Sequence, residues 1–233
     1  MGLLFAPHPQ IQARVDTIGR DRAPVLVIDQ LCADPDGLVT AAEQAFAAGR
    51  RPRASFPGIV TPGDPAFAQS LIAYLMPTLC KVFGVSRRVQ TGGFDFQLMT
   101  SAPEDLSPRQ ARPHFDVPDL DVVASVLFLC RPPYRGTAFY RHNPTEFEVI
   151  SPDRARAYEE VQKALDARGS DGRYMNGDTV DFSEIARYDV AFNRMILFSA
   201  ASLHSGTAEA DQIFSEDPKC GRLTANLFLK FEK

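Results

Sequence analysis

The sequence predicts an α+β domain that is mainly β, with two helices ahead of most of the strands. Short runs rich in β-branched and aromatic residues alternate with turns that contain proline or glycine, a pattern typical of β-sandwich and jelly-roll proteins. Two stretches with apolar residues at helical spacing come early in the chain. The 233 residues contain no repeat, low-complexity tract or linker, so we predict a single domain over residues 1–233.

Several segments are expected to form strands, and two of them carry the clearest patterns. The segment 121–130 (DVVASVLFLC) is apolar on both faces, which predicts a central strand covered on two sides. The segment 92–100 (GGFDFQLMT) alternates and places Gln97 on its polar face, between Asp95 and Met99. The remaining strands are expected at 23–30, 136–140, 190–199 and 222–231.

Helices are expected in three places, each with a proline near its start. The first covers about residues 35–48 and the second about 65–83, where Pro77 is expected to kink or interrupt it. The third covers about 151–168 and has a charged outer face. The segment 50–65 is rich in proline, glycine and arginine and is expected to be a loop.

Charge and cysteine usage restrict the classes of partner. The formal net charge of −4 and the pI near 5.6 give no electrostatic basis for binding nucleic acid or an anionic membrane. No apolar run approaches the ~20 residues of a membrane span, and the N-terminal residues MGLLFAPHPQ do not resemble a signal peptide. The four cysteines are widely spaced without a CxxC pair, so we expect reduced thiols, Cys220 among them in a polar loop, in a cytoplasmic protein.

The pair of His114 and Asp116 is the first sign of a functional site. Residues two apart in a strand point to the same face, so the imidazole and the carboxylate can converge on one metal ion. Chance often supplies so short a pattern in a chain of this composition. Taken alone, the pair favours the simpler interpretation, a histidine hydrogen-bonded to a neighbouring carboxylate.

A third ligand has three candidates among the remaining histidines. His8 lies in a proline-flanked terminus, where order is least expected, and His142 follows the strand expected at 136–140. His204 lies among small residues, which leave room for a ligand beside the imidazole, and we prefer it to His142. The alternative for His204 is a capping or turn histidine. Two imidazoles and one carboxylate suit non-haem Fe(II) and leave positions open for substrate and O2.

Arg222 stands at the start of the last expected strand, in apolar surroundings. A buried guanidinium needs an anionic partner, and its planar fork matches a carboxylate. Thr224 lies two residues further on and faces the same way. The alternative is an internal salt bridge, for instance to Asp95 or Asp189.

The order His-x-Asp, then His, then Arg-x-Thr, each on or beside an expected strand, is more specific than any of its parts. In these residues the sequence resembles the Fe(II)- and 2-oxoglutarate-dependent dioxygenases, most closely their prolyl-hydroxylase-like branch. The resemblance covers about residues 23–231, and its motifs are PHFD (113–116), GTAFY (136–140), MILF (195–198), LHSG (203–206) and GRLTAN (221–226).

The resemblance implies a double-stranded β-helix of the jelly-roll, cupin-like type with supporting N-terminal helices. It also implies that His114, Asp116 and His204 bind Fe(II), and that Arg222, with Thr224, holds the distal carboxylate of 2-oxoglutarate. Two spacings exceed those usual in the family. We assign the extra length to the helix near 151–168 and to an acidic surface loop at 209–218.

The function implied by the resemblance is hydroxylation with Fe(II), 2-oxoglutarate and O2, of an unidentified small-molecule or peptide substrate. Gln97 is expected to line the same pocket. Two alternatives remain open at this point. One is a cupin-like metal enzyme that does not use 2-oxoglutarate, and the other is a non-catalytic accessory or binding protein on the same fold.

Overall fold

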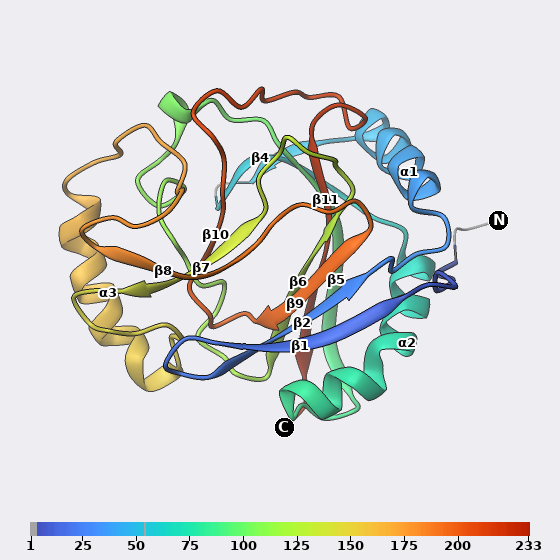
Figure 1. The fold of residues 1–233 in the computed structure, drawn as a ribbon, viewed down its shortest axis with the longest axis horizontal. Helices are drawn as coiled ribbons and strands as arrows, with labels where there is room; N and C mark the ends of the chain where they lie inside the picture. The colour runs from blue at the N-terminus through green and yellow to red at the C-terminus, as the bar shows by residue number, and fades with distance from the viewer. Residues whose placement is uncertain (1–3, 54) are drawn as a thin grey trace.

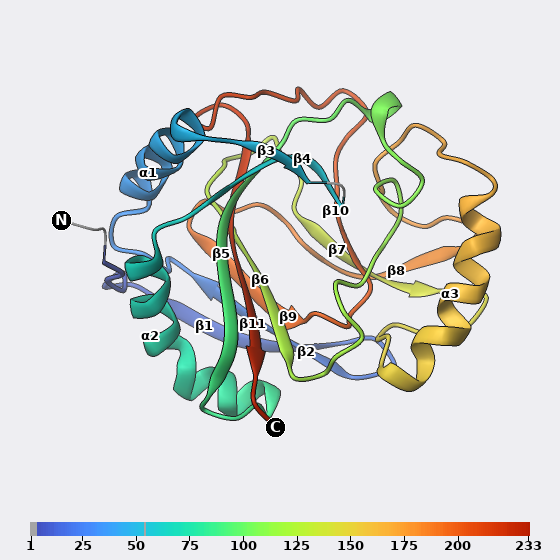
Figure 2. The same ribbon diagram turned by 180° about the vertical axis from the view of Figure 1, so that it is seen from behind.

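A computed structural model describes residues 4–53 and 55–233, with strands arranged in two antiparallel sheets (Figures 1 and 2). The larger sheet has eight strands in the order β1-β2-β9-β6-β11-β5-β4-β3, and the smaller has three in the order β10-β7-β8. The strands of the larger sheet are Gln12–Ile18 (β1), Ala23–Asp29 (β2), Arg51–Arg53 (β3), Phe56–Pro62 (β4), Val89–Met99 (β5), Val122–Phe128 (β6), Arg194–Ser199 (β9) and Arg222–Phe231 (β11). Those of the smaller sheet are Thr137–His142 (β7), Phe182–Tyr188 (β8) and His204–Gly206 (β10).

Three α-helices flank the sheets, α1 (Pro35–Ala48), α2 (Pro65–Phe83) and α3 (Pro152–Asp166), and a 3-10 turn covers Pro103–Asp105. The side chains of Asp34 and Asp64 accept hydrogen bonds from the first turns of α1 and α2, which satisfies amides that have no partner within the helix. α1 and α2 lie together at one end of the molecule, whereas α3 lies at the opposite end beside the smaller sheet (Figure 1).

The main core lies between the first two helices and the outer face of the larger sheet. Leu71, Leu75 and Leu79 of α2 are buried there with Leu26 and Leu127 of the sheet. Residues four apart on a helix share one face, so this stripe of leucines is the face that α2 buries.

A second core lies between the two sheets. Val25, Val27 and Phe198 of the larger sheet pack there with Phe139 of the smaller sheet. Because side chains alternate along a strand, β2 sends its valines inward and Leu26 outward to the helices. The polar residues of β5 and β11 share this inner face with the second core, as described below.

Most of the expected elements are present, but some assignments were wrong. The segment 50–65 is not a loop, because β3 and β4 form the edge of the larger sheet there. An edge strand tolerates proline, and Gly58 is required where the chain passes close to β5, since a Cβ atom would lie 2.1 Å from the carbonyl oxygen of Leu98. Pro77 does not interrupt α2, which continues to Phe83. The strands β1 and β8 were not predicted.

Within residues 4–53 and 55–233, one helix, α2, is long and apolar enough to cross a membrane by length and composition alone. The expectation that no segment approaches this length is therefore wrong for α2. Its apolar character has a second explanation, because Phe67, Leu71, Leu75 and Leu79 form the face buried against the sheet. Residues 1–3, which belong to the segment judged not to be a signal peptide, lie outside the described residues.

Truncating a buried leucine of α2 tests this packing. Leu71 is fully buried, so Leu71→Ala is expected to lower the free energy of unfolding by about 2–5 kcal/mol through lost burial and cavity formation. The same truncation at Leu120, which is 54% exposed, is expected to cost less than about 1 kcal/mol. Urea unfolding followed by circular dichroism measures both. Equal costs at the two positions would contradict the assigned core.

Candidate metal centre

The site is built on a backbone pairing between two segments that are distant in the sequence. His114 and His204 are antiparallel partners, and each amide donates to the carbonyl oxygen of the other, at 2.9 and 2.8 Å. Directly opposed residues place their side chains close together, and the two imidazole centroids are 4.5 Å apart. The segment 113–116 forms this isolated bridge and is not part of a named strand. The expectation that His114 and Asp116 lie in or beside a regular strand is therefore only partly met.

Asp116 completes the group from the position two residues after His114. Its amide donates to the carbonyl oxygen of Ala200 at 2.8 Å, which fixes the backbone beside the carboxylate. The Nε2 atoms of His114 and His204 each lie 3.9 Å from an oxygen of Asp116. One ligand atom from each of the three residues lies within 4.8 Å of the others, so small side-chain rotations bring all three onto one ion.

The ring of His204 is oriented by the protein. Its Nδ1 atom lies 2.9 Å from the carbonyl oxygen of Ser202, an acceptor that fixes the proton on Nδ1 and leaves Nε2 with its lone pair. The side chain is 9% exposed, whereas the His114 side chain is 41% exposed. His204 is therefore the buried residue of the pair, with its ring held by a hydrogen bond, and His114 is the more exposed one.

The other candidate histidines lie elsewhere. His142 is fully buried beside α3, where its ring packs against Tyr158 and Phe182 and its Nδ1 atom contacts the hydroxyl of Thr145 at 2.8 Å. His8 lies near the N-terminus, where Nδ1 accepts from the amide of Gln10. The structure thus brings His204, and neither of these two, to His114 and Asp116.

Arg222 is 4% exposed and is held by backbone carbonyl groups. Its Nε atom donates to Arg135 at 2.8 Å and its Nη2 atom to Gly136 at 2.7 Å, and Phe128 lies beneath the guanidinium with its centroid 5.9 Å away. Within the described chain Arg222 pairs with no carboxylate, so the internal salt bridge to Asp95 or Asp189 is not formed. Burial lowers the pKa of Arg222, which expresses the cost of a buried cation without an anion.

One cavity of about 430 Å³ on the inner face of the larger sheet is lined by His114, Asp116, His204 and Arg222. β11 and β5 are paired so that Thr224 lies opposite Gln97 and Asn226 opposite Asp95, and these four residues line the cavity too. The structure therefore brings all six predicted site residues to one cavity. The rest of its wall includes Phe56, Pro57, Gly93, Gln110, Ala124, Ser125, Val126, Thr137, Phe198, Ser205, Gly206 and Phe228.

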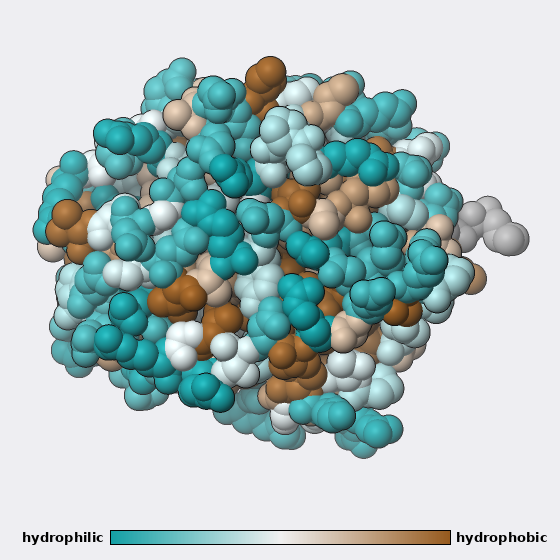
Figure 3. Space-filling view, in the orientation of Figure 1, coloured by the Kyte–Doolittle hydropathy of each residue, from teal (hydrophilic) through white to brown (hydrophobic). Residues whose placement is uncertain are grey.

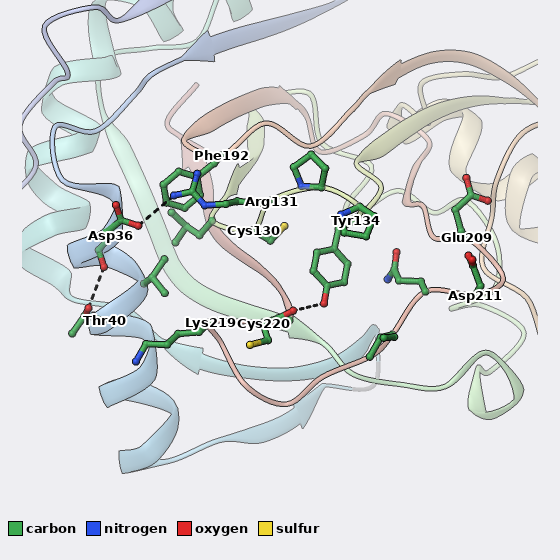
Figure 4. Close-up of a pocket in the computed structure, with 17 residues that line it drawn as sticks. Asp36, Thr40, Cys130, Arg131, Tyr134, Phe192, Glu209, Asp211, Lys219 and Cys220 are labelled. Atoms are coloured by element: carbon green, nitrogen blue, oxygen red, sulfur yellow. Dashed lines mark hydrogen bonds and ion pairs between the residues drawn. The ribbon is translucent and has the colours of Figure 1, made fainter.

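A second cavity of about 650 Å³ contains none of these ligands (Figure 4). It lies between α1, the turn at 130–134 and the loop at 209–221, and the hydroxyl of Tyr134 donates to the carbonyl oxygen of Cys220 across it. Cys130 is buried in its wall, and burial raises the pKa of this thiol to about 11. All four cysteines are free, as expected, and Cys220 is exposed.

Comparison with solved structures identifies the class of fold. SnoK, a non-heme alpha-ketoglutarate-dependent carbocyclase from nogalamycin biosynthesis, superposes with a TM-score of 0.53 at 11% identity, over 89% of this chain and 79% of SnoK. HygX from Streptomyces hygroscopicus, with nickel and 2-oxoglutarate bound, gives a TM-score of 0.52 at 14% identity, over 92% of this chain and 83% of HygX. At such identities the likeness is one of fold alone.

The sequence itself places the chain in a family. Residues 9–229 match the family DUF6445, which is described as a family of unknown function, and the chain belongs to it. None of the curated proteins matches the sequence significantly. The family description assigns no function to the chain, so the residues of the site are the basis for inferring its chemistry.

Sequence reasoning missed one wall of the cavity. Phe56 and Pro57 belong to β4, which was interpreted as loop, and Gln110 belongs to the polar segment that precedes His114. The available signal was the run FPGIV, in which apolar residues surround a glycine, as they do where two strand backbones approach closely.

Removal of a histidine tests the ligand assignment. We expect His204→Ala to weaken Mn²⁺ binding by the apo protein at least about 100-fold, more than the loss typical of an outer-shell change. His142→Phe removes the imidazole nitrogens but keeps an aromatic ring against Tyr158, and it is expected to retain the wild-type affinity. Calorimetric titration measures both. A loss at His142 rather than at His204 would reverse the assignment.

His142 also predicts how stability depends on pH. Burial lowers the pKa of His142, and the nearby Asp181 opposes this only in part. The folded state thus binds fewer protons than the unfolded state, so this contribution to stability is complete above the unfolded pKa of about 6.5 and is lost as the pH falls. Between pH 7.5 and 5.5 the apo wild type should lose more stability in urea than His142→Phe. Parallel losses in the two proteins would refute the prediction.

Proposed function

We propose that this protein is a non-haem Fe(II)- and 2-oxoglutarate-dependent dioxygenase that hydroxylates its substrate. The observation that carries the proposal is the presence of two different anchors in one cavity, the group of His114, Asp116 and His204 and the buried Arg222 without a carboxylate partner. The first anchor suits a divalent metal ion. The second suits a small dicarboxylate that reaches the metal.

His114, Asp116 and His204 would hold the iron. Two neutral imidazoles and one carboxylate are the donor set of non-haem Fe(II) oxygenases, and they leave positions for a co-substrate and O2. The hydrogen bond from His204 Nδ1 to the carbonyl oxygen of Ser202 keeps Nε2 available, and the pairing of His114 with His204 holds the two rings beside each other. With 2-oxoglutarate and O2 bound, the metal supplies the oxidising power for C–H hydroxylation, and succinate and CO2 are released.

Arg222 and Thr224 would bind the distal carboxylate of 2-oxoglutarate. The backbone carbonyl groups of Arg135 and Gly136 hold two nitrogens of the guanidinium, while Nη1 makes no hydrogen bond within the described chain. A bound carboxylate relieves the cost of the buried cation, and charge-assisted hydrogen bonds are the stronger kind. Gln97 lies opposite Thr224 and supplies a further polar group beside the same ligand.

The protein's own contribution is positioning. The co-substrate is held between a fixed cation and the metal ligands, so the reacting groups meet in one orientation. Apolar residues on the same wall, including Val126 and Phe198, would limit access of water to the reacting atoms. We assign the two sheets to a double-stranded β-helix of the prolyl-hydroxylase-like branch, in a cytoplasmic protein that acts on a small molecule or a peptide.

Two other functions make different demands on the site. A cupin-like metal enzyme without 2-oxoglutarate requires the three ligands but gives no role to Arg222. A non-catalytic accessory protein requires neither. The dioxygenase is the function that uses both anchors, and we favour it for that reason.

Replacement of Arg222 tests the proposal. Arg222→Ala is expected to raise the dissociation constant of 2-oxoglutarate at least about 30-fold, because loss of one partner of a buried charge pair costs about 2 kcal/mol or more. Anaerobic titration of the Fe(II)-loaded protein, followed by its weak visible charge-transfer band, measures the affinity. Arg156→Ala, whose side chain is 91% exposed on α3, serves as the matched control and should bind normally.

The outcomes separate the three functions. A band in the wild type that is weakened in Arg222→Ala, together with succinate release in air, supports the dioxygenase. Metal binding without any effect of 2-oxoglutarate points to the other metal enzyme. A folded wild type that binds neither metal nor 2-oxoglutarate points to the accessory protein.

A further inference from the structure

The segment that carries two of the three candidate ligands has little support from the sheets. Within the described residues, the stretch from Ser107 to Asp121 contains no named strand, and its contribution to sheet pairing is the isolated bridge at His114. Ligands bind a metal well only when they are held close to the productive geometry. The support on the other side of this segment comes from α3.

Arg112 joins the segment to the C-terminal end of α3. Its Nη2 atom donates to the carbonyl oxygens of Leu165 and Gly169, both at 2.7 Å, and its Nη1 atom donates to the carboxylate of Asp166 at 3.1 Å. The side chain is 16% exposed, so solvent screens these contacts only weakly. A cation that binds the last carbonyl groups of a helix also has a favourable interaction with the helix dipole.

Tyr158, in the middle of α3, contacts the residues on either side of His114. Its hydroxyl donates to the carbonyl oxygen of Pro113 at 3.5 Å, and its ring packs edge to face against Phe115 with centroids 5.6 Å apart. Tyr158 is 3% exposed, and His142 supports the ring with a centroid distance of 5.0 Å. The position of His114 therefore depends on a side chain that does not itself line the cavity.

We propose that α3 is a brace for the metal site, in which Tyr158 and Arg112 are positioning residues that hold His114 and Asp116 in place for the ion. This inference rests on the proposed metal centre and extends it to a helix at the far end of the molecule from α1 and α2 (Figure 1). Neither residue lines the cavity. Their effect on binding passes through the backbone of residues 112–116.

The test compares two arginines that form ion pairs involving α3. Arg112 connects the segment of His114 and Asp116, called here the ligand segment, to α3, and Arg154 connects α3 to the loop of Asp21. Arg112 binds the ligand segment to the helix, whereas Arg154, on the helix itself, pairs with Asp21 at 2.6 Å and donates to the carbonyl oxygen of Val149 at 3.0 Å. Each of the two truncations removes one ion pair in which a residue of α3 takes part. We expect Arg112→Ala to weaken Mn²⁺ binding by the apo protein about 10- to 100-fold, and Arg154→Ala to change it less than about threefold.

Tyr158 supplies a second comparison, in case Arg112→Ala fails to fold. Tyr158→Phe keeps the ring against Phe115 and should retain Mn²⁺ affinity within about threefold, because the hydroxyl contact is long. Tyr158→Leu removes the aromatic contact and should weaken binding about 10- to 100-fold. Hydrogen exchange of the apo variants provides a readout independent of metal, with faster exchange expected at residues 112–117 in Arg112→Ala and Tyr158→Leu only.

Each outcome bears on a separate claim. A wild type that binds no Mn²⁺ overturns the proposed metal centre and the brace with it. A wild type that binds Mn²⁺, with equal affinity in Arg112→Ala, Arg154→Ala and Tyr158→Leu, overturns the brace alone. Equal losses in Arg112→Ala and Arg154→Ala also overturn it, because they indicate general destabilisation rather than positioning.

Discussion

The pairing of His114 with His204 is the interaction on which the candidate site depends. Two backbone hydrogen bonds join a segment that lies outside the named strands to the start of β10. The geometry of the bridge sets both imidazoles side by side, and the alternation of an extended chain then sets Asp116 beside them. The backbone hydrogen bonds thus place the three residues on one side of the chain, and rotation of the side chains completes their approach.

A second constraint is the cost of burying Arg222. The protein places a guanidinium at the end of the cavity and offers it two carbonyl groups and an aromatic ring, but no carboxylate within the described chain. A buried guanidinium without an anion destabilises the folded state through its desolvation. An uncompensated charge of this kind is characteristic of a binding site for an anion rather than of a structural ion pair. Exposed pairs elsewhere, such as Arg156 with Glu160, contribute little in comparison.

The sequence was most informative where a local pattern and a local structure coincide. The alternation in GGFDFQLMT predicted which face of β5 carries Gln97, and RLTANLFLKF did the same for Thr224 on β11. It failed where long-range contacts decide the structure. β3 and β4 exist because β5 offers them an edge, and β1 is largely exposed and has no apolar run to reveal it. The contacts of Tyr158 with Phe115 and Pro113 join positions more than 40 residues apart, which no spacing in the sequence discloses.

The environment of Arg222 depends on two further segments that carry no regular structure. Tyr174, from the turn region after α3, stacks on Phe214, from the acidic loop, with centroids 5.1 Å apart and planes inclined by 17°. Tyr174 also donates to the carbonyl oxygen of Ser101 at 2.8 Å and packs with Met99, the direct neighbour of Arg222 in the sheet. This cluster therefore packs against the residue that lies opposite Arg222 in the sheet. Because a charge interacts more strongly where water is scarce, the buried position of Arg222, which is 4% exposed, favours a carboxylate ligand. Segments outside the larger sheet thus lie at both ends of the candidate site, with α3 beside the segment of His114 and Asp116 and the two loops beside Arg222.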